Sequence, residues 1–137
     1  MEKLSVRTNA HCQMVDVTDD IRELVASCPW RQGAVLLFSP HTTCGVTINE
    51  GADPDVRGDM TGWFSRAVPR VPEFHHAEGN SDAHIKTSLF GTSVMVPLEN
   101  GELCLGTWQS IYLCEGDGPR VRQLWVQFLP GLDNGQG

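Results

Sequence analysis

The second half of the sequence is a succession of short apolar segments separated by turn residues, and this pattern constrains the fold more than any other feature. The segments are Ser93 to Pro97, Leu103 to Leu105, Gln109 to Cys114 and Val121 to Phe128. Asn100 and Gly101 stand between the first two, and this dipeptide favours the tight turn of a β-hairpin. Because short strands joined by turns pair with their neighbours in antiparallel fashion, we expect a largely antiparallel sheet.

Two segments of the first half carry the signals of helices between further strands. Thr18 is a candidate N-cap for a helix over Thr18 to Val25, and the acids after it suit the positive end of the helix dipole. Asp53 and Pro54 begin a second helix with Asp at the N-cap and Pro at the first helical position. The apolar stripe of this second helix is Val56, Met60, Trp63, Phe64 and Ala67. We expect this stripe to face the core.

The expected strands of the first half are Leu4 to Arg7, Cys12 to Val17, Ala34 to Phe38 and Gly45 to Asn49. Strands, helix, strands, helix and a final run of strands predict a single α+β domain with two helices packed on the sheet. We assign residues 1–130 to this domain. Residues 131–137 have nothing to bury, so we expect this tail to fray.

Composition narrows the classes of function. The 137 residues carry a net charge of −7, which opposes nonspecific binding to nucleic acid or to an anionic membrane. The longest strongly apolar run, Ala34 to Phe38, is too short to span a bilayer. The five cysteines are an odd number without a Cys-x-x-Cys pair, which fits a reducing compartment. We therefore expect a cytoplasmic protein without nucleic-acid or membrane partners.

The segment from His75 to His84 holds three of the five histidines, His75, His76 and His84. Imidazole is the commonest protein metal ligand and titrates near neutral pH. The nine-residue interval between His75 and His84 matches no standard zinc spacing, so a polar surface loop is the alternative. The density of histidines still favours function for at least one of His75 and His84, whereas His76 fits both interpretations equally.

Three further clusters carry chemistry-bearing side chains, and the third of them has two parts, one around Trp108 and one around Arg120. His41 and Thr42 stand in a turn between two strands, where functional groups are commonly positioned. Glu50 lies between a strand and the Asp53 cap, where carboxylates suit Mg²⁺. Trp108 and Gln109 offer a stacking face and hydrogen-bonding groups. Arg120 and Arg122 alternate along an expected strand and suit phosphate recognition. Each cluster also has a plain structural explanation as a turn, a helix cap or a solvated strand face.

Together these strings resemble the YjbQ-like family, which is associated with secondary thiamine-phosphate synthase activity. The matching segments are His41 to Glu50, Asn80 to Lys86, Gly101 to Gln109 and Asp117 to Arg122. The resemblance covers nearly the whole chain. It implies a compact α+β subunit assembled as a homotrimer, in which loops such as His41 to Gly45 would meet across a subunit boundary.

The resemblance also implies a reaction that joins an aminopyrimidine methyl diphosphate to a thiazole phosphate and releases diphosphate. Such chemistry needs stabilisation of the departing charge. The side chains expected to bind the phosphorylated substrate or to stack on it are Thr42, Asn49, Lys86, Trp108, Gln109, Arg120 and Arg122. Glu50 and Asp53 would hold Mg²⁺.

Two alternatives stay open. In the first, His41, His75 and His84 bind a divalent metal such as zinc that activates water, and the chain hydrolyses a small phosphorylated or amide metabolite. His76 or Glu78 would then move protons, and Glu50 would assist catalysis in the synthase. In the second alternative, the chain is a non-catalytic trimeric metabolite-binding protein that uses the same pocket.

Overall fold

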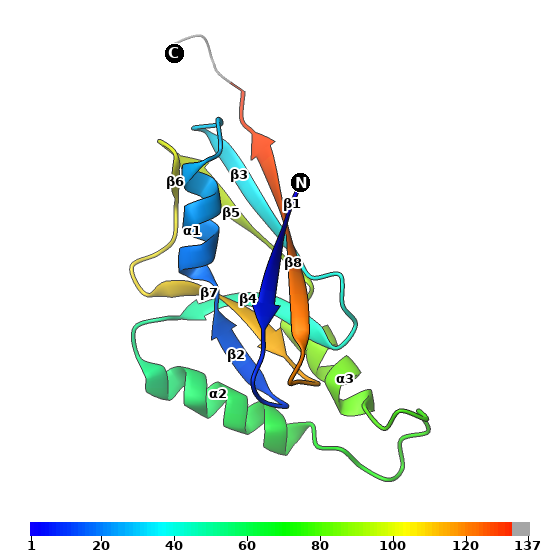
Figure 1. The fold of residues 1–137 in the computed structure, drawn as a ribbon. Coiled ribbons are helices and arrows are strands. Elements are labelled where there is room, and N and C mark those ends of the chain that lie inside the picture. Colours follow the sequence, from blue (N-terminus) through cyan, green and yellow to red (C-terminus); the bar gives the residue numbers. More distant parts are fainter. Residues whose placement is uncertain (133–137) are drawn as a thin grey trace.

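The computed structural model describes residues 1–132, which form eight strands and three helices (Figure 1). In chain order they are β1 (Glu2–Arg7), β2 (Gln13–Asp16), α1 (Thr18–Ala26), β3 (Gly33–Phe38), β4 (Cys44–Glu50), α2 (Pro54–Ala67), α3 (Ser81–Phe90), β5 (Ser93–Glu99), β6 (Glu102–Leu103), β7 (Gln109–Glu115) and β8 (Val121–Pro130). The predicted α+β class is confirmed. The predicted tail lies mostly outside the described residues. None of the described helices is long and apolar enough to cross a membrane.

The strands form two antiparallel sheets rather than one. The larger sheet has the order β1-β8-β3-β5-β6, and the smaller has the order β2-β7-β4. The predicted hairpin is confirmed, because β5 and β6 pair from Leu98 opposite Leu103. Asn100 and Gly101 have φ angles of 53° and 76°, the left-handed values that the tight hairpin turn requires.

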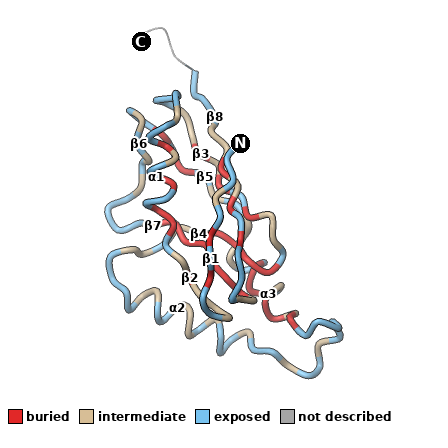
Figure 2. Tube along the Cα trace, in the orientation of Figure 1, coloured by how far each residue is buried: buried red, intermediate tan, exposed pale blue. Residues whose placement is uncertain are grey.

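The core lies between the inner face of the larger sheet and one face of the smaller sheet. Its fully buried members include Leu37 on β3, Val46 on β4 and Leu113 on β7, and Ile21 of α1 packs into the same cluster. A second cluster, Met14, Tyr112 and Cys114, lies on the other face of the smaller sheet. Met60 of α2 and Phe90 of α3 pack against that second cluster. The buried residues are accordingly most numerous along the strands where the two sheets meet (Figure 2).

The expectation of two helices was wrong, because Ser81–Phe90 forms a third helix, α3. The buried residues of α3 are Asp82, Ala83, Lys86 and Thr87. Three of these four are polar, so the face that packs inward has no apolar stripe and gives no helical period in a hydrophobicity pattern. This helix matters for function because it carries His84.

The apolar stripe of α2 is not core. No residue of α2 is buried, and the Trp63 side chain is 55% exposed. Phe64 meets Phe90 of α3 edge-on at 4.5 Å between ring centroids, and this contact lies in the last turn of α2, one turn beyond the partly buried Met60. Periodicity identified an apolar face correctly, but it does not say whether the subunit supplies a partner for that face.

Candidate functional site

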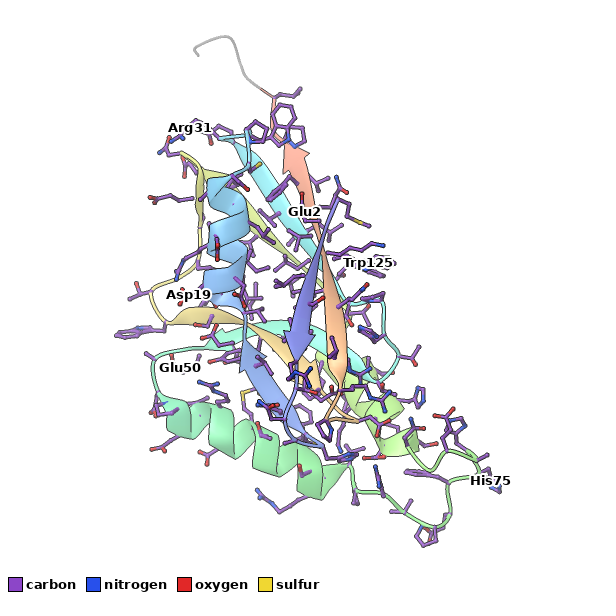
Figure 3. The ribbon with its side chains drawn as sticks, viewed as in Figure 1. Glu2, Asp19, Arg31, Glu50, His75 and Trp125 are labelled. Atoms are coloured by element: carbon purple, nitrogen blue, oxygen red, sulfur yellow. The ribbon has the colours of Figure 1, made fainter. Side chains whose placement is uncertain are left out.

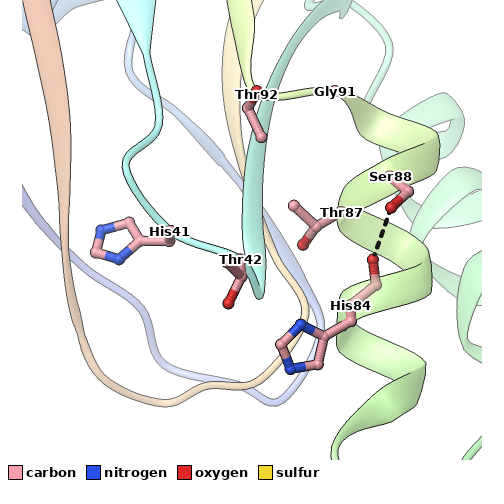
Figure 4. Close-up of a pocket in the computed structure, with 7 residues that line it drawn as sticks. All are labelled: His41, Thr42, His84, Thr87, Ser88, Gly91 and Thr92. Atoms are coloured by element: carbon pink, nitrogen blue, oxygen red, sulfur yellow. Dashed lines mark hydrogen bonds between the residues drawn. The ribbon is translucent and has the colours of Figure 1, made fainter.

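The β3–β4 loop, the segment before α3, the start of α3 and the start of β8 enclose an open cleft of about 390 Å³. It is lined by Pro40, His41, Thr42, Thr43, His76, Glu78, Asn80, His84, Arg120 and Arg122. We call this the histidine cleft. A second hollow shares His41, Thr42 and His84 with it and extends past Thr87 of α3 to Thr92, which follows the helix (Figure 4). The histidine cleft is therefore one lobe of a larger depression between the β3–β4 loop and α3.

Two histidine rings face each other in the cleft. The His76 and His84 ring centroids are 5.5 Å apart and the rings are perpendicular. Glu78 lies beside them, with Oε1 at 4.0 Å from His76 Nε2. His75 does not line the cleft. Of the two adjacent histidines, His76 is therefore the one that meets His84.

His41 is held as a neutral hydrogen-bond donor. Its Nε2 atom accepts a hydrogen bond from the backbone N–H of Gln123 at 2.9 Å. A neutral imidazole that accepts at one nitrogen carries its proton on the other, so Nδ1 is the donor. Burial lowers the pKa of His41, and the positive charge of Arg122 lowers it further. At neutral pH His41 therefore offers an N–H group and no charge.

The two arginines that line the cleft have different surroundings. Arg122 is buried, and its guanidinium donates to the Glu115 carboxylate, with Nε at 2.8 Å from Oε2, and to Thr43 Oγ1 at 2.8 Å. Burial by itself would raise the pKa of Glu115, but hydrogen bonds from Arg122, Asp117 N–H and Thr8 lower it overall. Arg120 is half exposed and pairs with Asp117 at 3.0 Å. Arg122 thus braces the cleft wall, and Arg120 is the more accessible cation.

The donor set does not fit the expected metal. His41 Nε2 already accepts a backbone hydrogen bond, and His75 lies outside the cleft. Glu50 Oε2 accepts from Ala52 N–H and Asp53 Oδ1 from Asp55 N–H, so these carboxylates shape a turn and a helix start. Within residues 1–132 no three side chains of His, Cys, Asp or Glu are grouped to hold a metal ion.

The other residues singled out from sequence lie away from the cleft. Figure 3 shows Glu50 and His75 on opposite sides of the molecule. Trp108 is 65% exposed, and Gln109 Oε1 accepts from Gly106 N–H at 2.7 Å within the turn before β7. Asn49 Oδ1 accepts from the next backbone N–H. Lys86 is buried and paired with Asp82. The structure therefore brings together His41, Thr42, His84, Arg120 and Arg122 from the expected set and leaves the rest elsewhere.

Sequence reasoning missed a polar network beside the cleft. Asp82 pairs with Lys86 at 3.0 Å and with His11 at 3.3 Å, and Asp117 pairs with Arg70 at 3.5 Å. His11 stands apart from the other four histidines in the sequence, so it gives no pattern that would mark it as part of a site. A separation of 71 residues between His11 and Asp82 leaves no local pattern that would reveal the contact.

The fold and the cleft define a class of single-domain α+β proteins with two antiparallel sheets and histidines gathered at the start of α3. Comparison with known proteins shows the family: the chain belongs to the YjbQ family, because the family model described as "UPF0047 protein YjbQ-like" matches residues 2–131. The chain is 43% identical to the UPF0047 protein YugU of Bacillus subtilis, over 94% of this chain and 98% of that protein. It is 42% identical to MJ1081 of Methanocaldococcus jannaschii, over 93% and 92%.

Solved structures agree with this assignment. A YjbQ/UPF0047 family protein from Clostridium acetobutylicum superposes with a TM-score of 0.91 at 43% identity, covering 94% of this chain and 100% of that chain. The conserved hypothetical protein TT1486 from Thermus thermophilus gives a TM-score of 0.86 at 42% identity, with 94% and 100% coverage. The resemblance to the YjbQ-like family is thereby confirmed.

The expectation of thiamine-phosphate synthesis was wrong. The family and these relatives are described only as UPF0047 or uncharacterised conserved proteins, so membership supplies no such activity. The structure removes the local support as well. Trp108 and Glu50, expected to stack on the pyrimidine and to hold Mg²⁺, do not line the cleft that contains the histidines and arginines.

Proposed function

We propose that the histidine cleft binds a small phosphorylated metabolite. The observation that carries this proposal is the convergence of His41, His76 and His84 from three separate segments on one open cleft. Arg120 and the hydroxyls of Thr42 and Thr43 line the same cleft, and Glu78 is the one carboxylate among its lining residues. Imidazole N–H, guanidinium and hydroxyl groups are the donors that a phosphate requires.

The charges around the cleft favour an anion site confined to the cleft, although the protein as a whole is acidic. Arg122 is neutralised by Glu115 behind the cleft wall, so it aligns Thr43 rather than attracting anions at a distance. The donors that remain act mainly over hydrogen-bond distances. They suit a compact anion that enters the cleft and not an extended polyanion, which agrees with the net charge of −7.

His84→Ala is expected to weaken binding of diphosphate about tenfold, because a hydrogen bond to a charged group contributes on the order of 1.5–3 kcal/mol. His75→Ala is the matched control, since His75 belongs to the same histidine-rich segment but does not line the cleft. Titration calorimetry at constant ionic strength measures both variants against the wild type. If the two variants bind diphosphate with the same affinity as the wild type, the cleft is not the anion site.

Hydrolysis of the bound metabolite is a second candidate function, favoured by Glu78 lying 4.0 Å from His76. A carboxylate next to imidazole is an arrangement that can orient a general base. Release of inorganic phosphate from phosphate monoesters distinguishes the two functions. A binding protein shows stabilisation that grows with the logarithm of ligand concentration and no product.

We also infer a homotrimer, because the outer face of the larger sheet is apolar. Its neighbouring strands β3, β5 and β8 expose Phe38 (40%), Met95 (56%) and Leu129 (36%). Trp125 stacks on Phe38 at 5.9 Å. Monomeric proteins rarely expose a contiguous apolar patch of several such side chains. Contact between subunits would cover this patch, and the resemblance to the YjbQ-like family implies that the assembly is a trimer.

Met95→Glu is expected to dissociate the assembly, because the patch would then bury a carboxylate without a partner. Leu89→Glu, at an exposed position of α3 (58%), is the control that adds the same charge elsewhere. Light scattering measures the mass of each variant at micromolar concentration. A monomeric wild type would contradict the trimer, and a trimeric Met95→Glu would show that another surface mediates it.

A further inference from the structure

Cys12 and Lys86 form a contact that the proposed function does not use. Cys12 precedes β2, and Lys86 lies on α3. The Lys86 Nζ atom is 3.2 Å from Cys12 Sγ and 3.0 Å from Asp82 Oδ2. We propose that Cys12 and Lys86 are a modification site, at which a hydroperoxide drives formation of a reversible sulfur–nitrogen crosslink between the two side chains.

Burial fixes the amine beside the sulfur. Lys86 is 2% exposed, and Asp82 is 1% exposed. A lysine normally samples many rotamers, but here the ion pair with Asp82 holds Nζ in position. Because the reacting atoms are already within van der Waals contact, the bond formation is effectively intramolecular, and such proximity gives large rate advantages. Cys12 itself is only partly buried.

Two further observations point to a reactive centre here. A cavity of about 10 Å³, the space of a single water-sized molecule, is lined by Cys12, Lys86 and Glu115 among others. It can take the water molecule that the reaction releases beside the sulfur, although it is too small for the peroxide itself. In addition, Asp82 Oδ1 is buried without a hydrogen-bond partner, although Oδ2 accepts from Lys86. The Nε atom of Arg70 lies 3.8 Å from this oxygen. Burial alone would raise the pKa of Asp82, but hydrogen bonds from Lys86 and His11 lower it, so the carboxylate stays charged and keeps the amine in place.

The chemistry balances in two steps. In the first, the Cys12 thiol attacks the peroxide oxygen and gives a sulfenic acid and water, so sulfur is oxidised by two electrons and the peroxide is reduced. In the second, the Lys86 ammonium group first loses one proton to solvent, and the lone pair of the neutral amine attacks that sulfur. The S–O bond breaks as the S–N bond forms, the departing hydroxyl takes a second proton from the nitrogen, and water leaves. Excess thiol reverses the bond and becomes a disulfide.

The other cysteines have different environments. Burial raises the pKa of Cys44 to about 12 and also raises the pKa of Cys114, so these thiols stay protonated and unreactive. Cys104 is exposed, but the groups near its sulfur are the Glu99 carboxylate and the Glu102 carbonyl. Among the cysteines of residues 1–132, Cys12 is the one with a hydrogen bond from a side-chain amine.

The crosslink would tie the turn before β2 to α3, the helix that carries His84 of the histidine cleft. Its formation does not depend on what the cleft binds. Oxidation of Cys12 would nevertheless affect the cleft, because the crosslinked helix carries His84.

The test treats the full-length protein with stoichiometric hydrogen peroxide and measures its intact mass and its free thiols. We expect a mass lower by two hydrogen atoms, loss of one of the five thiols, and a proteolytic peptide that joins Cys12 to Lys86. Dithiothreitol should restore the original mass. Cys104→Ser should behave like the wild type, and Cys12→Ser should show neither the mass loss nor the joined peptide.

Three results would overturn the proposal. Loss of two thiols for the same mass change would identify a disulfide. A gain of oxygen at Cys12 without a joined peptide would show that the amine does not react. An unchanged mass would show that Cys12 is inert. Because the wild-type protein alone decides among these results, the test does not depend on whether a Lys86 variant folds.

Discussion

Arg122→Ala is expected to lower the free energy of unfolding by about 3–5 kcal/mol, the cost of breaking a buried ion pair by removing one partner. Arg122 and Glu115 are 3% and 2% exposed. Without the guanidinium, the Glu115 carboxylate would keep only the Thr8 hydroxyl and the Asp117 N–H as donors. Thr43, which accepts from the same guanidinium, would also lose its support in the cleft wall.

Urea denaturation of Arg122→Ala and the wild type measures this effect, with Arg120→Ala as the matched control. Arg120 pairs with Asp117 at the surface, its side chain is 50% exposed, and surface pairs contribute about 0–1 kcal/mol. Equal stability losses in the two variants would contradict the distinction between a bracing and an accessible arginine.

The pH dependence of the same experiment has a definite sign. In the wild type the pKa of Glu115 is lowered, so the stability it contributes is present above its unfolded pKa, about 4.3, and is lost as the pH falls through the folded pKa. In Arg122→Ala, burial without the cation would raise that pKa instead. The difference in stability between wild type and variant should therefore be largest near neutral pH and shrink under acidic conditions.

The two arginines also show where sequence reasoning reaches its limit. Alternation predicted that Arg120 and Arg122 share one strand face. The strand β8 begins at Val121, as expected, so Arg120 belongs to the preceding turn and the period of two does not extend to it. The strand boundary thus separates a surface cation from a buried one.

Most strands were predictable because alternation of apolar residues is a local signal, and the buried faces of these strands are apolar. The helix α3 was not predictable in this way, because Asp82, Lys86 and Thr87 occupy its buried face. Two of those polar residues, Asp82 and Lys86, have partners far away in sequence, His11 and Cys12. Local periodicity carries no information about such partners.

The candidate site was predictable in part. The density of histidines directed attention to one segment, and His76 and His84 of that segment line the cleft. The contribution of His41 depends on tertiary structure, since the β3–β4 loop reaches that segment only after the sheets have packed. The predicted metal set of His41, His75 and His84 has the same limit, because spacing along the chain does not show that His41 Nε2 accepts a hydrogen bond from the backbone of β8.

Leu37→Ala is expected to lower the free energy of unfolding by about 2–5 kcal/mol, whereas Trp63→Ala should change it by less than about 1 kcal/mol. Leu37 is fully buried on the inner face of β3, so its truncation leaves a cavity between two sheets that cannot both close on it. Trp63 has the larger side chain but is 55% exposed, and its aromatic contact is with its own neighbour, Phe64.

Denaturant unfolding at micromolar protein concentration compares the two variants, and a parallel measurement of mass keeps assembly separate from folding. A large loss for Trp63→Ala together with dissociation would show that α2 forms a subunit contact. A large loss in a variant that keeps the wild-type mass would contradict the exposed position of the helix. A small loss for Leu37→Ala would contradict the assignment of the main core to the space between the sheets, on which the position of the β3–β4 loop and the shape of the histidine cleft depend.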